Sequence, residues 1–386
     1  MIKLSAIGDV ALFGDYSKLI NDKGHKYPFS KVSSYLNKND ILLANLETPL
    51  SNIGTPDKSK PISLCGSPGA IDSLTHTGIT HVSLANNHSY DYGEEAIIDT
   101  QKRLKEAGIS FIGIGDNLQH SRQPVVENIP GGKLAILAYN SYTTNGRHYA
   151  SKLRGGVAPL EYKYIKLDIE SIKQNHANII IIVSLHWGVE GSNYPTPFQR
   201  DLAHQIIRDG ANLIIGHHPH VLQGIEQYNK GIIAYSLGNF CFPSVSSPHI
   251  KGLGYSQKYE NRESYIFQCE ITSDNIVGSF RVIPVFLNSD LQPEIALDEE
   301  KLRIQKKIHY LSKPLNKAEY GKFFIDYSDK INNKNNRFYS FLKEKGISGI
   351  LKRLNPVYIR ALIIALNNFL LERRHRRQFM KKEEGI

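Results

Sequence analysis

Histidine, carboxylate and amide side chains recur after short apolar runs in the first part of this chain. One run ends in Asp9, and a later one ends in His217-His218-Pro219-His220. Imidazole nitrogens together with carboxylate and amide oxygens suit Mn, Fe or Zn better than Ca²⁺. We therefore predict a site for a divalent transition metal, with one or two ions, whose ligands are Asp9, Glu47, Asn87, His186, His218 and His220.

His88 directly follows the predicted ligand Asn87, so it would lie beside the metal without having to bind it. Asp91 could hold one ring nitrogen of His88 and thereby fix its tautomer. We predict His88 as the general acid for a leaving group, with Asp91 as its partner. Further residues of the same loops are predicted to contact the ligands or the substrate: Asn45, Asn86, Glu190, His217 and Asn239.

Several of these residues have simpler explanations. Asp9, Asn86 and Asn239 could cap helices or form turns, and Glu47 could be a solvated loop residue. The histidine cluster is harder to explain in this way. In an extended chain, His218 and His220 would project to one side and His217 to the other, as the period of two requires.

The predicted ligands follow strands of an α/β fold, in which short β-branched runs alternate with helical patterns over roughly the first 290 residues. In such sheets, ligands bind beyond the carboxyl ends of the strands, where loops converge. The strands expected to carry the site are Ile2–Gly8, Ile41–Leu46, Thr80–Ala85, Ile179–Leu185, Asn212–Ile215 and Ile232–Leu237. The expected helices include Gly93–Ala107, Tyr162–Asn175 and Pro197–Asp209.

The net charge of +10 is concentrated near the C-terminus, where residues 336–386 contain twelve Lys or Arg and four Glu. We predict a main domain over residues 1–290 and a helical, basic extension over residues 291–386. An amphipathic or largely apolar helix is predicted over Val357–Leu371, followed by a basic segment. This part could lie on an anionic membrane surface or dock on the body. No aromatic stacking platform accompanies these charges, so we do not expect nucleic-acid binding.

Three cysteines without paired spacing argue against a disulfide framework. The N-terminal residues lead directly into a strand rather than into a basic and apolar leader. We therefore expect a cytoplasmic protein, with peripheral contact at the inner membrane face as an option for the basic extension.

Six motifs occur in order along the chain, namely Gly8-Asp9-Val10, Asn45-Leu46-Glu47-Thr48-Pro49-Leu50, Ala85-Asn86-Asn87-His88 with Asp91-Tyr92-Gly93, His186-Trp187-Gly188-Val189-Glu190, Gly216-His217-His218-Pro219-His220-Val221-Leu222-Gln223 and Ser236-Leu237-Gly238-Asn239-Phe240. Together they resemble the CapA family of bacterial poly-gamma-glutamate capsule synthesis proteins, which are distant relatives of calcineurin-like metallophosphoesterases. The resemblance implies a four-layer αββα sandwich with a helical C-terminal extension. It implies that Asp9 is the first metal carboxylate, that Glu47 stands at the bridging position, and that Asn87 and His88 match the Asn-His pair of phosphoesterases.

The chain departs from the phosphoesterase pattern at two positions. Ala11 stands where a histidine is usual, and Glu47 stands where an aspartate is usual. Two functions follow from the resemblance. The first is a metal-dependent hydrolase of capsule or exopolymer synthesis that acts on a phosphoester or an anionic polymer. The alternative is a non-catalytic accessory or polymer-binding subunit of a capsule synthesis complex.

Overall fold

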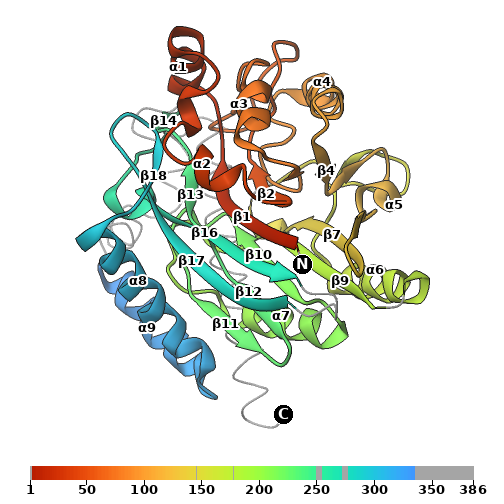
Figure 1. Ribbon diagram of the computed structural model, residues 1–386, viewed down its shortest axis with the longest axis vertical. Helices are drawn as coiled ribbons and strands as arrows, with labels where there is room; N and C mark the ends of the chain where they lie inside the picture. Colours follow the sequence, from red (N-terminus) through yellow and green to blue (C-terminus); the bar gives the residue numbers. More distant parts are fainter. Residues whose placement is uncertain (1, 145, 177, 249–253, 272–276, 335–386) are drawn as a thin grey trace, which may run out of the picture.

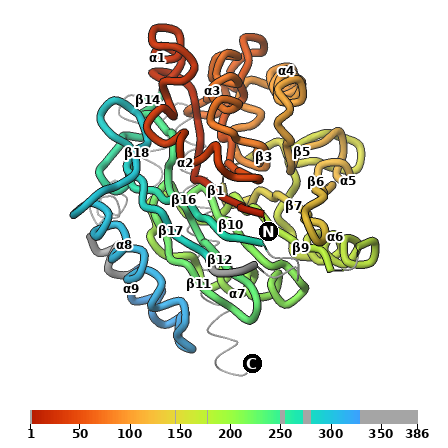
Figure 2. The backbone as a smooth tube through the Cα atoms, viewed as in Figure 1, coloured from red at the N-terminus to blue at the C-terminus, as the bar shows by residue number. Residues whose placement is uncertain are grey.

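The computed structural model describes residues 2–144, 146–176, 178–248, 254–271 and 277–334 (Figure 1). Two large β-sheets face each other in the centre of the molecule, and helices cover their outer faces. In the backbone trace of Figure 2, the N-terminal strand lies near the middle of the view.

The first sheet has eight strands, and β1 (Ile2–Val10) lies in its middle. Strands β1 to β4 are parallel, whereas β16 to β18 are antiparallel to their neighbours. The order is β18 (Pro293–Ile295), β17 (Val277–Leu287), β16 (Glu263–Ile271), β1, β2 (Ile41–Leu46), β3 (His81–Ser83) and β4 (Ser110–Ile112), with β13 (Asn239–Cys241) also paired to β1.

The second sheet has six strands, and its four inner strands are parallel. The order is β11 (Ile225–Tyr228), β12 (Gly231–Ala234), β10 (Leu213–His217), β9 (Ile179–His186), β7 (Gly132–Asn140) and β6 (Val125–Ile129). Two small pairs join β5 (Ile114–Gly115) to β8 (Gly156–Val157) and β14 (Val245–Ser246) to β15 (Gly254–Tyr255).

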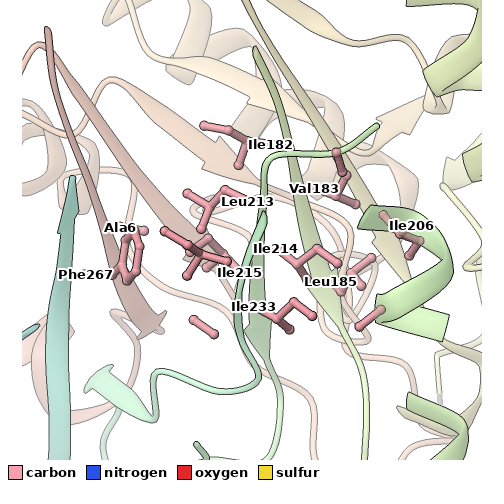
Figure 3. Close-up of a cluster of buried hydrophobic side chains, with 14 of the residues drawn as sticks. Ala6, Ile182, Val183, Leu185, Ile206, Leu213, Ile214, Ile215, Ile233 and Phe267 are labelled. Atoms are coloured by element: carbon pink, nitrogen blue, oxygen red, sulfur yellow. The ribbon is translucent and has the colours of Figure 1, made fainter. Parts of the chain in front are cut away.

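Strand β10 is buried on both faces because it lies between the other sheet and a helix (Figure 3). Its residues Leu213 and Ile215 lie near Phe267 of the eight-stranded sheet. On the opposite face, Ile214 lies toward Ile206 of α7 (Pro197–Asp209). Successive strand residues point to opposite faces, so a continuous apolar run is what a strand in this position requires.

Helices cover the outer face of each sheet and complete a four-layer αββα sandwich, as expected. Apolar residues of α1 (Asp15–Lys23), α3 (Ala70–Thr77) and α4 (Gly93–Glu106) pack in one core with the eight-stranded sheet. Those of α6 (Tyr162–Asn175) and α7 pack in the core that contains the six-stranded sheet. The shorter helices are η1 (Tyr27–Phe29), α2 (Ser33–Leu36), α5 (Leu118–Ser121), η2 (Tyr142–Thr144), η3 (Tyr259–Arg262) and η4 (Lys313–Asn316).

The described residues beyond 290 pack against this body. Strand β18 pairs with β17, and Ile304 and Ile308 of α8 (Asp298–Ser312) belong to the core of the six-stranded sheet. Helix α9 (Tyr320–Lys334) contributes Phe324 to the same core. The division of the chain at residue 290 stays a prediction, and the predicted helix and basic segment after residue 356 lie outside the described residues. Within the described ranges, no helix is both long and apolar enough to cross a membrane.

Candidate metal centre

The pairing of parallel strands brings the predicted residues to one edge of the two sheets. Asp9 at the end of β1 lies opposite Asn45 of β2 and opposite Asn239 of β13. In the second sheet, His217 of β10 lies opposite His186 of β9. A hydrogen-bond contact of 3.1 Å between the Nδ1 atom of His217 and the Oδ1 atom of Asp9 joins the two sheets at this edge. Each strand therefore delivers its polar end group to the same place.

Two overlapping groups of side chains could each hold a metal ion. In one, ligand atoms of Glu47, His218 and His220 all lie within 4.8 Å of one another, and in the other the same holds for Asp9, Glu47 and His186. All five residues are buried. Glu47 belongs to both groups, so its carboxylate stands where it could bridge two ions.

Unpartnered polar atoms in this cluster fit a bound cation. The Oε1 atom of Glu47, the Nε2 atom of His217 and the Nδ1 atom of His218 are buried and have no hydrogen-bond partner among the described residues. A buried polar atom without a partner costs free energy that a coordinate bond to a cation would offset. The mixture of imidazole nitrogen and carboxylate oxygen suits a divalent transition metal.

The two acidic groups differ in how the protein solvates them. The Oδ1 atom of Asp9 accepts a hydrogen bond of 2.9 Å from Asn45, and its Oδ2 atom accepts one of 3.3 Å from the backbone N–H of His218. Burial raises the pKa of Asp9, but contacts with His217 and His220 more than offset this effect, so the pKa lies well below its usual value. Burial and then the nearby charge of Asp9 raise the pKa of Glu47 well above its usual value. Without a cation, ionisation is therefore easier for Asp9 than for Glu47.

His186 connects the amide ligand predicted after β3 to the carboxylates. Its Nε2 atom lies 2.7 Å from the Oδ1 atom of Asn87 and 3.5 Å from the Oε1 atom of Glu47. Its Nδ1 atom lies 3.2 Å from the amide nitrogen of Asn45. Asn87 itself is only partly buried, so its amide oxygen lies where the buried cluster meets the surface.

His88 and Asp91 form the pair predicted from the sequence. The Nδ1 atom of His88 lies 2.5 Å from the Oδ2 atom of Asp91, and the backbone N–H of Leu64 donates to the same oxygen over 2.7 Å. Asp91 is fully buried, whereas His88 is partly exposed. The carboxylate thus fixes the orientation of the ring, as a general acid requires. The Oδ1 atom of Asp91 contacts the ammonium group of Lys60, a residue that we did not predict for this site.

The backbone of the histidine cluster differs from the extended chain that we expected. His218 and His220 have φ angles of 97° and 57°, so the chain turns at both positions. The argument that His217 must point away from its neighbours was therefore wrong, because alternation applies only to an extended strand. His217, the last residue of β10, contacts Asp9. The turn that follows brings His218 and His220 close to Glu47. The Nε2 atom of His220 lies 3.7 Å from the Oε1 atom of Glu47.

The residues predicted around the ligands have different positions. Asn86 is buried and donates to the backbone oxygen of Leu46 over 2.8 Å, so it ties the loop after β3 to β2. Asn239 accepts from the Nδ1 atom of His220 over 2.8 Å, which orients that ring. Glu190 is exposed in the turn after β9. Two contacts of His220 were missed, namely the ring of Tyr255 at 5.4 Å and the side chain of Asn261, which donates to its carbonyl oxygen over 2.9 Å.

Taken together, fold and site define a four-layer αββα protein with a candidate metal cluster at the carboxyl ends of its strands. Residues 3–244 match the family model described as "Bacterial capsule synthesis protein PGA_cap", and the chain belongs to this family. It is 33% identical over 249 residues to the capsule biosynthesis protein CapA of Bacillus anthracis, covering 62% of this chain and 60% of that protein. It is 30% identical over 343 residues to the PGA biosynthesis protein CapA of Bacillus subtilis, covering 86% of this chain and 85% of that protein.

A more distant relative is a probable polyglutamine synthesis accessory protein of Mycobacterium tuberculosis, 25% identical over 72% of this chain and 75% of that protein. Solved structures similar to this one include a phosphatase from Mycoplasma pneumoniae, with 14% identity, a TM-score of 0.46, and coverage of 80% of this chain and 98% of that chain. A putative 5'-nucleotidase from Staphylococcus aureus has 11% identity and a TM-score of 0.45, and the match covers 80% of this chain and 58% of that chain. Similarity at this level says nothing about reaction or ligand.

Proposed function

We propose that this chain is a metal-dependent hydrolase of capsule or exopolymer synthesis, of the poly-gamma-glutamate type. The proposal rests mainly on Glu47, whose buried and unpartnered Oε1 atom lies within reach of His186 at the end of β9 and of His220 in the turn after β10. The names of the relatives in two Bacillus species support the link to capsule synthesis. The substrate would be a phosphoester or an amide bond of an anionic polymer.

The residues of the chain divide into ligands and a proton donor. Asp9, Glu47, Asn87, His186, His218 and His220 would hold one or two ions of Mn, Fe or Zn. A divalent ion in such a site polarises the scissile group and makes water a better nucleophile at neutral pH. His88 would give a proton to the leaving group, because Asp91 fixes its ring at the partly exposed side of the cluster.

The test is the metal content of protein purified without chelator, measured together with turnover on the same sample. We expect bound Mn, Fe or Zn and hydrolysis of a generic phosphodiester or of a glutamyl-linked polymer. His88→Ala should keep the metal and lose turnover by on the order of 10²-fold or more, as expected for a general acid. His309→Ala is the matched control, because His309 is exposed on α8. If the metal-loaded protein hydrolyses neither class of substrate, the chain is not such a hydrolase.

The contacts of Asp9 favour a second function, a non-catalytic accessory or polymer-binding subunit. Both oxygens of Asp9 already accept hydrogen bonds from the protein, and the neighbouring Ala11 offers no ligand. Such a site could hold a single ion for structure only. This function predicts stoichiometric metal, co-purification with a capsule synthesis enzyme, and no turnover in isolation.

The basic segment near the C-terminus would add contact with an anionic membrane surface from the cytoplasmic side. The sequence alone supports this proposal, since residues 335–386 lie outside the described ranges. Flotation with anionic liposomes, comparing the full chain with a chain truncated after Pro356, tests it. Equal flotation of the two chains would remove the membrane proposal.

A further inference from the structure

A buried lysine lies behind the predicted general acid. Lys60 comes from the loop between β2 and α3, and only 9% of its surface is exposed. A buried ammonium group is expensive unless it is paired and hydrogen-bonded. Its side chain contacts the Oδ1 atom of Asp91 and donates to the backbone carbonyl of Asn87 over 2.7 Å. Asn87 directly precedes His88, and Asp91 follows it after Ser89 and Tyr90, so the two acceptors flank His88 in the sequence.

Asp91 is enclosed by the same loop through its backbone as well. The N–H of Asp57 donates to the carbonyl of Asp91 over 2.8 Å, and the N–H of Leu64 donates to its side chain over 2.7 Å. At Gly54, with a φ angle of 88°, a Cβ atom would lie 2.2 Å from the carbonyl oxygen of Tyr92, so this position requires glycine. The loop thus surrounds one carboxylate whose remaining contact is the ring of His88.

The two oxygen atoms of the Asp91 carboxylate therefore contact different side chains. Its Oδ2 atom holds the Nδ1 atom of His88 at 2.5 Å, and its Oδ1 atom is held by Lys60. Without Lys60, the Oδ1 atom would lose its cationic partner, and the carboxylate could turn away from the ring. The carbonyl of Asn87 would lose its hydrogen bond from Lys60 at the same time, which loosens the residue that carries the predicted amide ligand.

We propose that Lys60 is a positioning residue that holds Asp91 and the Asn87 backbone, so that His88 faces the reacting bond in a fixed tautomer. The proposal deepens the proposed function and rests on it for the catalytic consequence. Lys60 is not a metal ligand, because its ammonium group is engaged by a carboxylate and a carbonyl. Its loss should therefore change proton donation and leave the metal content unchanged.

The first measurement is the ring ¹⁵N spectrum of His88 in the zinc-loaded full chain, assigned by the signals that disappear in His88→Ala. In Lys60→Met, these signals should shift or broaden, because the partner of the Nδ1 atom is no longer fixed. Lys58→Met is the control, since Lys58 is exposed in the same loop. An unchanged His88 spectrum in Lys60→Met overturns the proposal, whether or not the protein hydrolyses any substrate.

The second measurement compares phosphodiesters with good and poor leaving groups. For an alkyl ester, which needs a proton from His88, Lys60→Met should lower kcat by about 10- to 100-fold with KM unchanged. For a nitrophenyl ester, whose leaving group needs no proton, Lys60→Met should lower kcat only slightly. Equal losses on both esters overturn the positioning role. Lys60→Arg, which keeps the charge, should recover part of kcat, and Lys60→Gln replaces the Met variant if that variant does not fold. If wild-type protein hydrolyses neither ester, the proposed function fails and the spectrum alone decides the role of Lys60.

Discussion

Replacing Glu47 with glutamine should separate metal binding from folding. Glu47 is completely buried, and burial together with the nearby charge of Asp9 raises its pKa well above the usual value, so its ionised form is disfavoured without a cation. Glutamine has nearly the same shape and is neutral. We therefore expect Glu47→Gln to change the stability of the metal-free protein by less than about 1 kcal/mol, because glutamine keeps the buried shape and replaces a carboxyl whose charged form burial already disfavours.

The metal-loaded protein should respond differently. An ion present at a hundred times its Kd stabilises a folded protein by about 2.7 kcal/mol. Glu47 belongs to both candidate groups, so its loss weakens either one. If the affinity falls about 100-fold, most of that stabilisation disappears at the same metal concentration. For a chain of this size, the difference corresponds to a loss of about 3 °C in the metal-dependent rise of Tm.

The assay is a thermal melt of wild type and Glu47→Gln, each with EDTA and with added Mn²⁺ or Zn²⁺, together with metal analysis after desalting. Glu319→Gln is the control, because Glu319 is exposed next to α9. A variant that melts like wild type in EDTA but gains nothing from metal supports the reasoning. If Glu47→Gln retains the full rise of Tm and the full metal content, Glu47 is not a ligand and the bridging role is wrong.

Three further changes test the packing that holds the site. Glu263 is fully buried and contacts two basic side chains of α8, so Glu263→Ala should cost about 2 to 4 kcal/mol in urea unfolding, less than a completely buried pair because both cations reach solvent. At Gly216, a Cβ atom would lie 1.9 Å from the carbonyl oxygen of Tyr235, so Gly216→Ala should lower Tm and disturb the histidines that follow. Thr196 forms a capping box with Gln199 at the start of α7, and Thr196→Ala should cost about 1 kcal/mol by the same unfolding measurement.

Much of the fold could be predicted from the sequence because strong periodicity and clear end signals coincide. Helix α6 and strand β2 have the predicted bounds, and α7 begins at Pro197 after its threonine cap. Less regular segments were missed, among them α1 and α3 before β3 and the edge strand β6. Strand β6 is only five residues long, and none of its residues is buried. Edge strands lack one partner, so their sequences carry a weaker signal.

The sequence allowed us to predict the site residues that stand at strand ends. It did not allow us to predict Lys60, which comes from a loop. Asp9 and His217 stand at strand ends, and strand pairing fixes their neighbours. Lys60 stands in a loop of polar and small residues, where a lysine is normally solvated. No local pattern distinguishes it from Lys58, which is exposed two residues earlier. The burial of Lys60 depends on contacts with Asn87 and Asp91, and these form only after the chain has folded.

The turn at the histidine cluster shows why spacing alone did not give the geometry. In an extended strand, three histidines in four positions could not all face one carboxylate cluster. Left-handed φ angles at His218 and His220 bend the chain, and with them all three rings lie near Asp9 or Glu47. Such angles are unfavourable for residues with side chains, so the surrounding structure must impose them. Two hydrogen bonds hold His220 in this conformation: its Nδ1 atom donates to Asn239, and its carbonyl oxygen accepts from the side chain of Asn261, and both partners lie downstream in the sequence. A conformation that depends on such distant partners cannot be inferred from the local sequence, whereas the residue types that it brings together can.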